Sequence, residues 1–291
     1  MIIVRLKGGM GNQMFQYAFG QALAKSLNTE LQLDLSSLLD RSKGDFVYRD
    51  YDLDIFEINP SFTNNPNLLR TIFKFKSSKL AKLVKRKVER SKVYVKEAHF
   101  HVMEDLLKNP KDNALYDGWW QSEKYFIKVA DQIRKEFSFK ENIIPESHVL
   151  FEKIHRTNAI CLNVRRTDFL KVATLNTTNL DYFLQAAKYI AERVEHPHFY
   201  IFSDDIQWSR KNIHLDYPTT IVDHKHKGKK FGNYLQLMKA CKHFIIPNSS
   251  FAWWAIWLNE NSSKIVVAPK NWFNEPKFDT SDLIPKTWIR L

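Results

Sequence analysis

Three groups of polar side chains in the second half of the chain could together bind a phosphate-bearing ligand. Each directly follows an apolar run: Arg165, Arg166 and Asp168 after 159–164, Ser203, Asp204 and Asp205 after 199–202, and Asn248, Ser249 and Ser250 after 243–246. Arginine binds phosphate through a planar fork of donors, and hydroxyls and N–H groups at a helix start add further donors. If the runs are parallel strands of one open sheet, the three groups lie where such sheets bind ligands.

The start of the chain is a fourth candidate binding element. The apolar run 2–6 ends in a Gly8-Gly9-Met10-Gly11 turn, and a helical pattern begins at Asn12 and Gln13. Glycines let the backbone adopt positive φ and let a ligand come close to the N–H groups of the new helix. A plain strand-to-helix turn produces the same pattern, so this motif alone does not establish a binding site.

The paired carboxylates Asp204 and Asp205 allow two interpretations. Such pairs can hold Mg²⁺ or Mn²⁺, but they can also cap a helix, bind a ribose or orient the arginines. We favour the roles without a metal, because arginines and helix N-termini can neutralise a departing diphosphate. A nucleotide-sugar transferase needs that arrangement, since its diphosphate leaves as the transferred sugar becomes cationic. The sequence contains no P-loop lysine motif, protein-kinase motif set or G-x-S-x-G elbow.

The hydrophobic periodicity predicts an α/β fold. Apolar runs at 2–6 and 30–35 flank a helical pattern over 12–27, which makes a βαβ unit with a parallel sheet. In the second half we expect strands at 159–164, 199–202, 220–222, 243–246 and 265–268, and helices at 180–194, 233–240 and 253–258. A polar, proline-containing stretch at 138–147 separates the halves, so we expect two domains, 1–145 and 146–291.

The bulk composition is that of an ordinary globular protein. The 291 residues are 44% hydrophobic and 26% charged, enough for two domains with their own cores. The two cysteines, Cys161 and Cys241, stand in apolar context and form no disulfide framework, which favours a reducing compartment. We find no secretory signal and no apolar run approaching the ~20 residues of a membrane span, so we expect a cytoplasmic protein.

Positive charge is concentrated in one segment, Arg70–Lys96. It contains eleven Lys or Arg and one acid, Glu89, and so carries +10 of the net charge of +12. Two interpretations are open: a basic amphipathic helix lying on the anionic inner face of the cytoplasmic membrane, or a packed helix with a solvated basic face. A non-enzymatic module binding nucleic acid or anionic lipid is a further hypothesis, but no zinc finger or helix-turn-helix motif supports nucleic-acid binding.

Several motifs resemble those of the family 11 glycosyltransferases, the bacterial α-1,2-fucosyltransferases. The opening Gly8-Gly9-Met10-Gly11-Asn12-Gln13-Met14-Phe15-Gln16-Tyr17-Ala18 resembles the family's N-terminal motif. Three later segments are similar to its further motifs: Asn163-Val164-Arg165-Arg166-Thr167-Asp168 (His-x-Arg-Arg-Gly-Asp in the family), Phe202-Ser203-Asp204-Asp205, and Asn248-Ser249-Ser250-Phe251-Ala252-Trp253-Trp254. The segment Trp119-Trp120-Gln121-Ser122-Glu123-Lys124-Tyr125-Phe126 is also typical of the family.

The resemblance implies a GT-B fold, with two Rossmann-like domains facing across a cleft. It implies an inverting transfer of fucose from GDP-fucose, without a metal or other cofactor. The acceptor it implies is a hydroxyl, O2 of a galactose-type residue, in a surface glycan such as the O-antigen of a lipopolysaccharide. By the same resemblance Arg165 holds the donor diphosphate and Asn12 lies near the phosphate and the reacting sugar. Ser249 and Ser250 would face the phosphates.

The motifs nominate residues for each part of the site. For the donor they are Gly9, Gly11, Gln13, Asn163, Arg165, Arg166, Asp168, Ser203, Asp204, Asp205, Tyr234, Asn248, Ser249 and Ser250. For catalysis they are Asn12 and Arg165, and for the acceptor Trp120, Gln121 and Glu123. An inverting transfer also needs a base for the acceptor hydroxyl. Asp34, at the end of the second strand, and Glu123 are candidates by position, although either can be structural.

Three positions depart from the family pattern. Asn163 replaces the histidine of the first motif, Thr167 replaces its glycine, and Tyr234 replaces an acid sixteen residues before Ser250. In fold relatives the histidine and the acid help to read guanine, whose N–H donor edge suits a carboxylate. An alternative function is therefore the same chemistry with a different sugar nucleotide.

Overall fold

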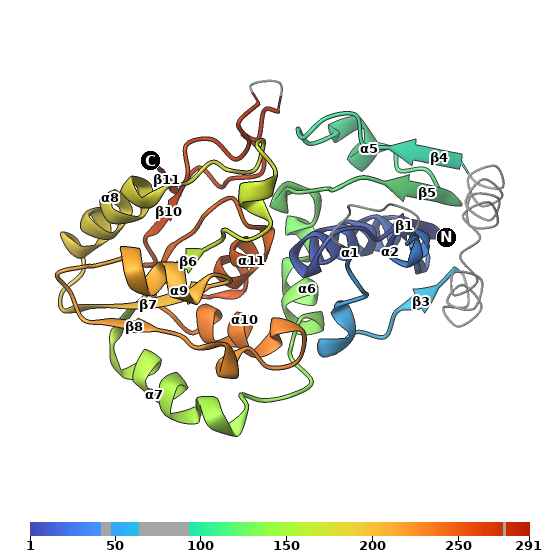
Figure 1. Cartoon of the computed structure of the whole chain (residues 1–291). Helices are drawn as coiled ribbons and strands as arrows, with labels where there is room; N and C mark the ends of the chain where they lie inside the picture. The colour runs from blue at the N-terminus through green and yellow to red at the C-terminus, as the bar shows by residue number, and fades with distance from the viewer. Residues whose placement is uncertain (42–47, 64–92, 276–277) are drawn as a thin grey trace. The chain divides into compact units, whose positions relative to one another are not determined.

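The computed structural model describes residues 1–41, 48–63, 93–275 and 278–291 (Figure 1). The chain divides into two compact units. Unit 1 contains Met1–Ser138 with Ser281–Leu283, and unit 2 contains Phe139–Thr280 with Ile284–Leu291. The change of unit at Ser138 falls inside the polar stretch 138–147, seven residues before the expected boundary. Of the basic segment, residues 70–92 lie outside the described residues, so both interpretations of it stay predictions.

Unit 1 contains a parallel sheet with strand order β3-β2-β1-β5-β4. The strands are β1 (Ile2–Arg5), β2 (Leu31–Asp34), β3 (Ser61–Phe62), β4 (Val93–Lys96) and β5 (Ala114–Asp117). The helices described in this unit are α1 (Met10–Ser26), α2 (Ser36–Leu39), α5 (Glu104–Lys108) and α6 (Ala130–Glu136). α1 packs against β1 and β2, as the βαβ pattern predicts. The pattern of short apolar runs gave no signal for β3 and β4, which are two and four residues long.

A buried ion network joins the three central strands of unit 1 at their carboxyl ends. Arg5 Nε lies 2.9 Å from Asp34 Oδ2, and Arg5 Nη1 lies 2.8 Å from Asp117 Oδ2. Asp34 also accepts hydrogen bonds from the backbone N–H and the hydroxyl of Ser36. Because Asp34 is fully buried, it has no access to an acceptor hydroxyl. The structure therefore makes Asp34 a structural carboxylate, in contrast to its expected candidacy as catalytic base.

Unit 2 contains a six-stranded parallel sheet with strand order β11-β10-β9-β6-β7-β8. The strands are β6 (Asn158–Val164), β7 (Pro197–Ser203), β8 (Thr219–Ile221), β9 (His243–Ile245), β10 (Val266–Ala268) and β11 (Ile289–Arg290). The described helices are α7 (His148–Arg156), α8 (Leu180–Ala191), α9 (Ile206–Asn212), α10 (Gly232–Lys239) and α11 (Ser250–Leu258). The strand order reverses between β6 and β9, so the carboxyl ends of these two strands border the expected ligand crevice.

Asp282 anchors a short late segment of the chain within unit 1. Its carboxylate accepts from Val102 N at 2.9 Å and from the ammonium of Lys124, and its backbone oxygen accepts from Ser122 Oγ at 2.6 Å. Partial burial raises the pKa of Asp282, but the Lys124 and Val102 bonds outweigh that effect and hold the pKa below its ordinary value. No described helix is long and apolar enough to cross a membrane.

We expect Asp282→Asn to reduce the pH dependence of stability. A carboxyl whose pKa is lowered by folding stabilises the folded state above its unfolded pKa of about 3.9, and this contribution is lost as pH falls through the folded value. The difference in urea midpoint between wild type and Asp282→Asn should narrow as pH falls below about pH 4. A difference that widens on acidification would contradict the ion pair as its source.

Candidate functional site

The first two predicted motifs of unit 2 meet at the carboxyl ends of β6 and β7. Arg165 Nη2 donates to Asp168 Oδ2 at 2.8 Å, and Arg165 Nη1 lies 3.4 Å from Asp204 Oδ2. Asp204 also accepts from the N–H of Arg166 and from the N–H and hydroxyl of Thr167. The Arg165 side chain is 29% exposed. Two fixed carboxylates therefore orient a guanidinium that still reaches solvent.

The second arginine packs against helix α9. The Arg166 guanidinium carbon lies 3.8 Å from the centre of the Trp208 ring, and Nε lies 3.6 Å from Asp205 Oδ2. Asp205 caps α9 by accepting from Trp208 N, and its own N–H donates to Ser203 Oγ. Asp204 and Asp205 thus brace the arginine loop and cap a helix, two of the expected roles. Among the described residues, no three His, Cys, Asp or Glu side chains lie close enough together to hold a metal ion.

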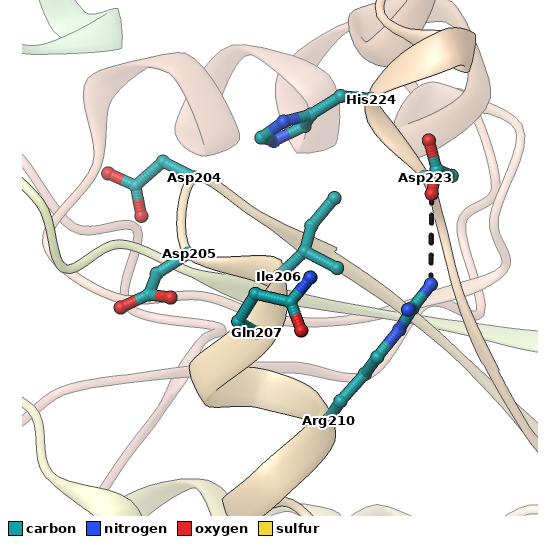
Figure 2. A pocket seen from close by; sticks show the side chains of 7 residues that line it. All are labelled: Asp204, Asp205, Ile206, Gln207, Arg210, Asp223 and His224. Carbon is teal, nitrogen blue, oxygen red and sulfur yellow. Dashed lines mark ion pairs between the residues drawn. The ribbon is translucent and has the colours of Figure 1, made fainter.

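A pocket of about 330 Å³ lies beside these carboxylates (Figure 2). It is lined by Asp204, Asp205, Ile206, Gln207, Arg210, Asp223 and His224. Figure 2 shows Asp204 and Asp205 on one side of Ile206 and the Arg210–Asp223 ion pair, at 3.7 Å, on the other. Three carboxylates repel a phosphate but accept hydrogen bonds from N–H and O–H groups. The pocket therefore suits a ribose or a nucleobase better than a phosphate.

The third motif presents one hydroxyl at the start of α11, beside β9. Asn248 Nδ2 donates to the backbone oxygens of Leu175 and Trp272, and Ser249 accepts from Ala252 N as the helix cap. Ser250 is half-buried, and its hydroxyl has no hydrogen-bond partner among the described residues. Of the three predicted residues, Asn248 braces loops and Ser249 caps the helix, whereas Ser250 is available to an anion at the helix N-terminus.

The two positions expected to read the nucleobase are bonded to backbone. Asn163 Nδ2 donates to Phe202 O at 3.1 Å, which leaves the Asn163 side-chain oxygen without a partner among the described residues. The Tyr234 hydroxyl donates to Val222 O at 3.0 Å, and burial with the nearby Asp223 raises its pKa. Tyr234 is 4% exposed. Its expected contact with the donor is thus replaced by an internal hydrogen bond, whereas Asn163 can still accept one.

In unit 1 the glycine turn lies against the side chain of Asn12. Gly8 has φ of +77°, and a Cβ there would lie 2.5 Å from Asn12 Nδ2 and 3.0 Å from a ring carbon of Trp119. Gly9 is the N-cap of α1, and Gly11 is in its first turn. Gln13 is fully buried and donates to the oxygens of Gly8 and Asp50 while accepting from Asp52 N. Gln13 therefore braces the turn and has no access to a donor molecule, contrary to expectation.

Trp120, which was expected to bind the acceptor, is buried, whereas its neighbour Trp119 is half-buried. Trp120 is fully buried, stacks on Phe19 at 4.1 Å and has φ of +55°. Trp119 is half-buried beside Gly8, with Lys7 Nζ 4.8 Å from its ring centre. Trp120 cannot touch an acceptor, so Trp119 is the better candidate for contact with a sugar. Glu123 is half-buried, and its carboxylate has no hydrogen-bond or ion-pair partner among the described residues.

Comparison with known proteins places the chain in a family. The sequence profile described as Glycosyl transferase family 11 matches residues 57–291. The chain belongs to glycosyl transferase family 11. It is 30% identical to an alpha-1,2-colitosyltransferase of Escherichia coli, across 100% of this chain and 99% of the relative. It is 29% identical to the O-antigen biosynthesis glycosyltransferase WbnK of Escherichia coli, across 98% of this chain and 99% of the relative.

Solved structures confirm the fold class. The fucosyltransferase NodZ from Bradyrhizobium superposes with a TM-score of 0.53, over 88% of this chain and 91% of NodZ, at 14% identity. The two parallel sheets are those of the expected GT-B fold, with two Rossmann-like units. Family 11 membership makes the chain a glycosyltransferase, with a nucleotide-sugar donor and a glycan acceptor.

Proposed function

We propose that this family 11 enzyme transfers fucose from GDP-fucose, with inversion and without a metal, to O2 of a galactose-type residue in a surface glycan. The observation that carries the proposal is the position of Arg165. Its guanidinium lies at the carboxyl end of β6, oriented by Asp168 and Asp204 and still 29% exposed. A fixed guanidinium of this kind binds a diphosphate most strongly as negative charge develops on it in the transition state.

The neighbouring side chains support a guanine nucleotide. The bond from Asn163 Nδ2 to Phe202 O leaves the side-chain oxygen of Asn163, which is 9% exposed, as an acceptor for the N–H donors of guanine. Ser250 and the start of α11 supply hydroxyl and N–H donors for phosphate oxygens. The pocket beside Asp204 accepts hydrogen bonds from a ribose or a base.

A different deoxysugar on the same nucleotide is the second candidate donor. The relative that is 30% identical is named for the transfer of colitose in an α-1,2 linkage. Colitose is fucose without the oxygen at C3, so the two donors differ by one hydroxyl. A site that hydrogen-bonds that hydroxyl would reject colitose strongly, whereas an apolar site would discriminate weakly. The two relatives also support an α-1,2 linkage and an O-antigen acceptor for this chain.

The acceptor side of the proposal rests on unit 1. Trp119 is a half-buried aromatic side chain, and its ring suits contact with the C–H face of a sugar. Glu123, with its unengaged carboxylate four residues further on, is our proposed base for the acceptor hydroxyl. A cytoplasmic location and contact of the segment 70–96 with anionic lipid stay predictions.

We expect calorimetry to show binding of GDP and not of UDP or dTDP. Asn163→Ala should weaken GDP binding about tenfold or more, because the guanine N–H edge loses its acceptor, and should leave pyrophosphate binding unchanged. Transfer from GDP-fucose to a galactose-terminated oligosaccharide should persist in EDTA, and NMR of the product should show an α-1,2 linkage.

Each arm of this experiment can contradict one part of the proposal. Absence of GDP binding at millimolar concentration would exclude a guanine nucleotide. Faster transfer from GDP-colitose than from GDP-fucose would assign the second donor. Loss of transfer in EDTA with recovery in Mn²⁺ or Mg²⁺ would restore the metal interpretation of Asp204 and Asp205.

A further inference from the structure

We propose that Gln121 is a positioning residue that fixes which end of the Asn12 side-chain amide faces the donor. The proposal rests on the proposed function and on the place near the donor phosphate and the reacting sugar that the family resemblance implies for Asn12. It reassigns Gln121, which the sequence motif placed in acceptor binding. Gln121 is 8% exposed, so it has little surface with which to touch an acceptor.

The contact between the two amides sets the orientation. Gln121 Nε2 donates to Asn12 Oδ1 at 2.7 Å. With its oxygen engaged in this way, Asn12 holds its NH₂ group over the Gly8 turn, where Nδ2 would lie 2.5 Å from a Cβ at Gly8. The NH₂ group has no hydrogen-bond acceptor among the described residues. Because Asn12 is only half-buried, this group is open to a ligand. Asn12 thus presents two N–H donors at the helix N-terminus, where an anion is favoured.

The backbone that carries Gln121 is held in an unusual conformation. Trp120 has φ of +55°, which is rare for a bulky residue, and its ring is locked by stacking on Phe19. The carboxylate of Glu97 accepts from Trp119 N at 2.6 Å and from Trp120 N at 3.0 Å. Such strain persists only where the surroundings impose it, and it is frequent at functional sites. Here it directs Gln121 toward Asn12 instead of continuing the alternation of an extended strand.

The orientation matters because the two ends of an amide interact oppositely with a phosphate. The NH₂ end donates hydrogen bonds to phosphate oxygens, whereas the oxygen end repels them. A carboxylate at position 121 would accept a hydrogen bond from Asn12 Nδ2 and so would turn the amide around. A protonated carboxyl at the same position would again donate to Asn12 Oδ1. Whether residue 121 donates this hydrogen bond to Asn12 or accepts it can therefore be tested.

The experiment is a double-mutant cycle with Gln121→Ala and Asn12→Ala, together with Gln121→Glu. Transfer from GDP-fucose is measured with donor and acceptor varied separately. We expect Gln121→Ala to lower kcat about 10- to 100-fold with little change in the KM for acceptor, because a misplaced group near the reacting atoms has effects of this size. In the Asn12→Ala background the same change should have almost no further effect.

The pH dependence of kcat in Gln121→Glu separates a positioning role from a purely structural one, which would not change it. Its kcat should be low at pH 8 and recover as pH falls and the new carboxyl becomes protonated. Wild type and Asn12→Ala/Gln121→Glu, which contain the same Glu97, Lys7 and Glu123, should show no such recovery. Melting temperatures identify a variant that fails to fold, and the cycle with Gln121→Ala then still decides the question.

Three outcomes would overturn the positioning role. They are a raised KM for acceptor with unchanged kcat, additive losses in the cycle, and a pH profile of Gln121→Glu parallel to that of wild type. If the wild-type enzyme transferred no fucose from GDP-fucose, that result would contradict the proposed donor and not the role of Gln121. The cycle would then be repeated with the donor that wild type does use, so the two failures are distinguishable.

Discussion

Replacing Arg165 by alanine is expected to lower kcat for transfer about 10²- to 10³-fold, the usual cost of losing one donor to a developing anion. The substitution also removes the positive charge that Asp168 and Asp204 now orient at 2.8 and 3.4 Å, and so makes the site more negative for a diphosphate. The melting temperature should change little, because a partly exposed ion pair contributes only about 0–1 kcal/mol. Steady-state kinetics and calorimetry with GDP measure the two effects separately.

A matched control is available on the same unit. Arg165 lies over the Phe169 ring, with its guanidinium carbon 5.5 Å from the ring centre. Arg193 likewise lies over an aromatic ring, 3.7 Å from the Tyr189 ring centre, and near a carboxylate, with Nη1 3.5 Å from Glu192. It is 45% exposed, lies two residues after the end of α8 and belongs to no predicted motif. Arg193→Ala should therefore keep wild-type kcat. Near-normal transfer by Arg165→Ala would remove Arg165 from the site and, with it, the observation on which the proposed function depends.

A second variant separates charge from geometry at the same position. Arg165→Lys keeps the positive charge but loses the planar fork that pairs with Asp168 and with phosphate oxygens. We expect it to recover only part of the loss. Adding Asp168→Asn to Arg165→Ala should restore GDP binding in part, because one of the two negative charges beside the missing guanidinium is removed.

The sequence predicted the elements of unit 2 closely, because its strands are continuous apolar runs that a parallel sheet buries on both faces. The strands expected at 159–164 and 199–202 are β6 and β7, and the polar residues after them do meet. The elements α7, α9 and β11 were not expected, but α8, α10 and α11 overlap the helices expected at 180–194, 233–240 and 253–258. These parts were predictable because each depends on residues adjacent in the chain.

The side chains that were misassigned depend on partners far away in sequence. Asp34 is a structural residue because Arg5, 29 positions earlier, lies beside it in the sheet. Trp120 is buried and Trp119 half-exposed because the backbone at Trp120 adopts positive φ, held by Glu97. A strand-like alternation does not specify such a turn. His224 lines the pocket although it belongs to none of the predicted motifs.

Arg5→Met is expected to destabilise unit 1 by about 3–5 kcal/mol, the usual result of removing one partner from a buried ion pair. Arg5 is 1% exposed and Asp34 is 0% exposed, so the remaining carboxylate would be buried without its counter-charge. Asp117, whose pKa Lys7 and Arg5 lower to about 2 against the effect of burial, would keep only Lys7 and Tyr94. Hydrogen exchange of β1, β2 and β5 amides measures the loss in unit 1 separately from unit 2.

The consequence for function follows from where this network lies. β1 leads directly from Arg5 into the Gly8 turn, so loosening the carboxyl ends of β1, β2 and β5 should also disturb the positioning of Asn12. Adding Asp34→Asn to Arg5→Met should recover much of the stability, because a neutral amide can remain buried while it accepts from Ser36 N and donates to Ser36 Oγ. If the double variant regains stability but not kcat, the network acts on the site through Arg5 itself. Equal protection of β1 amides in wild type and Arg5→Met would show that the ion pair contributes nothing to the fold.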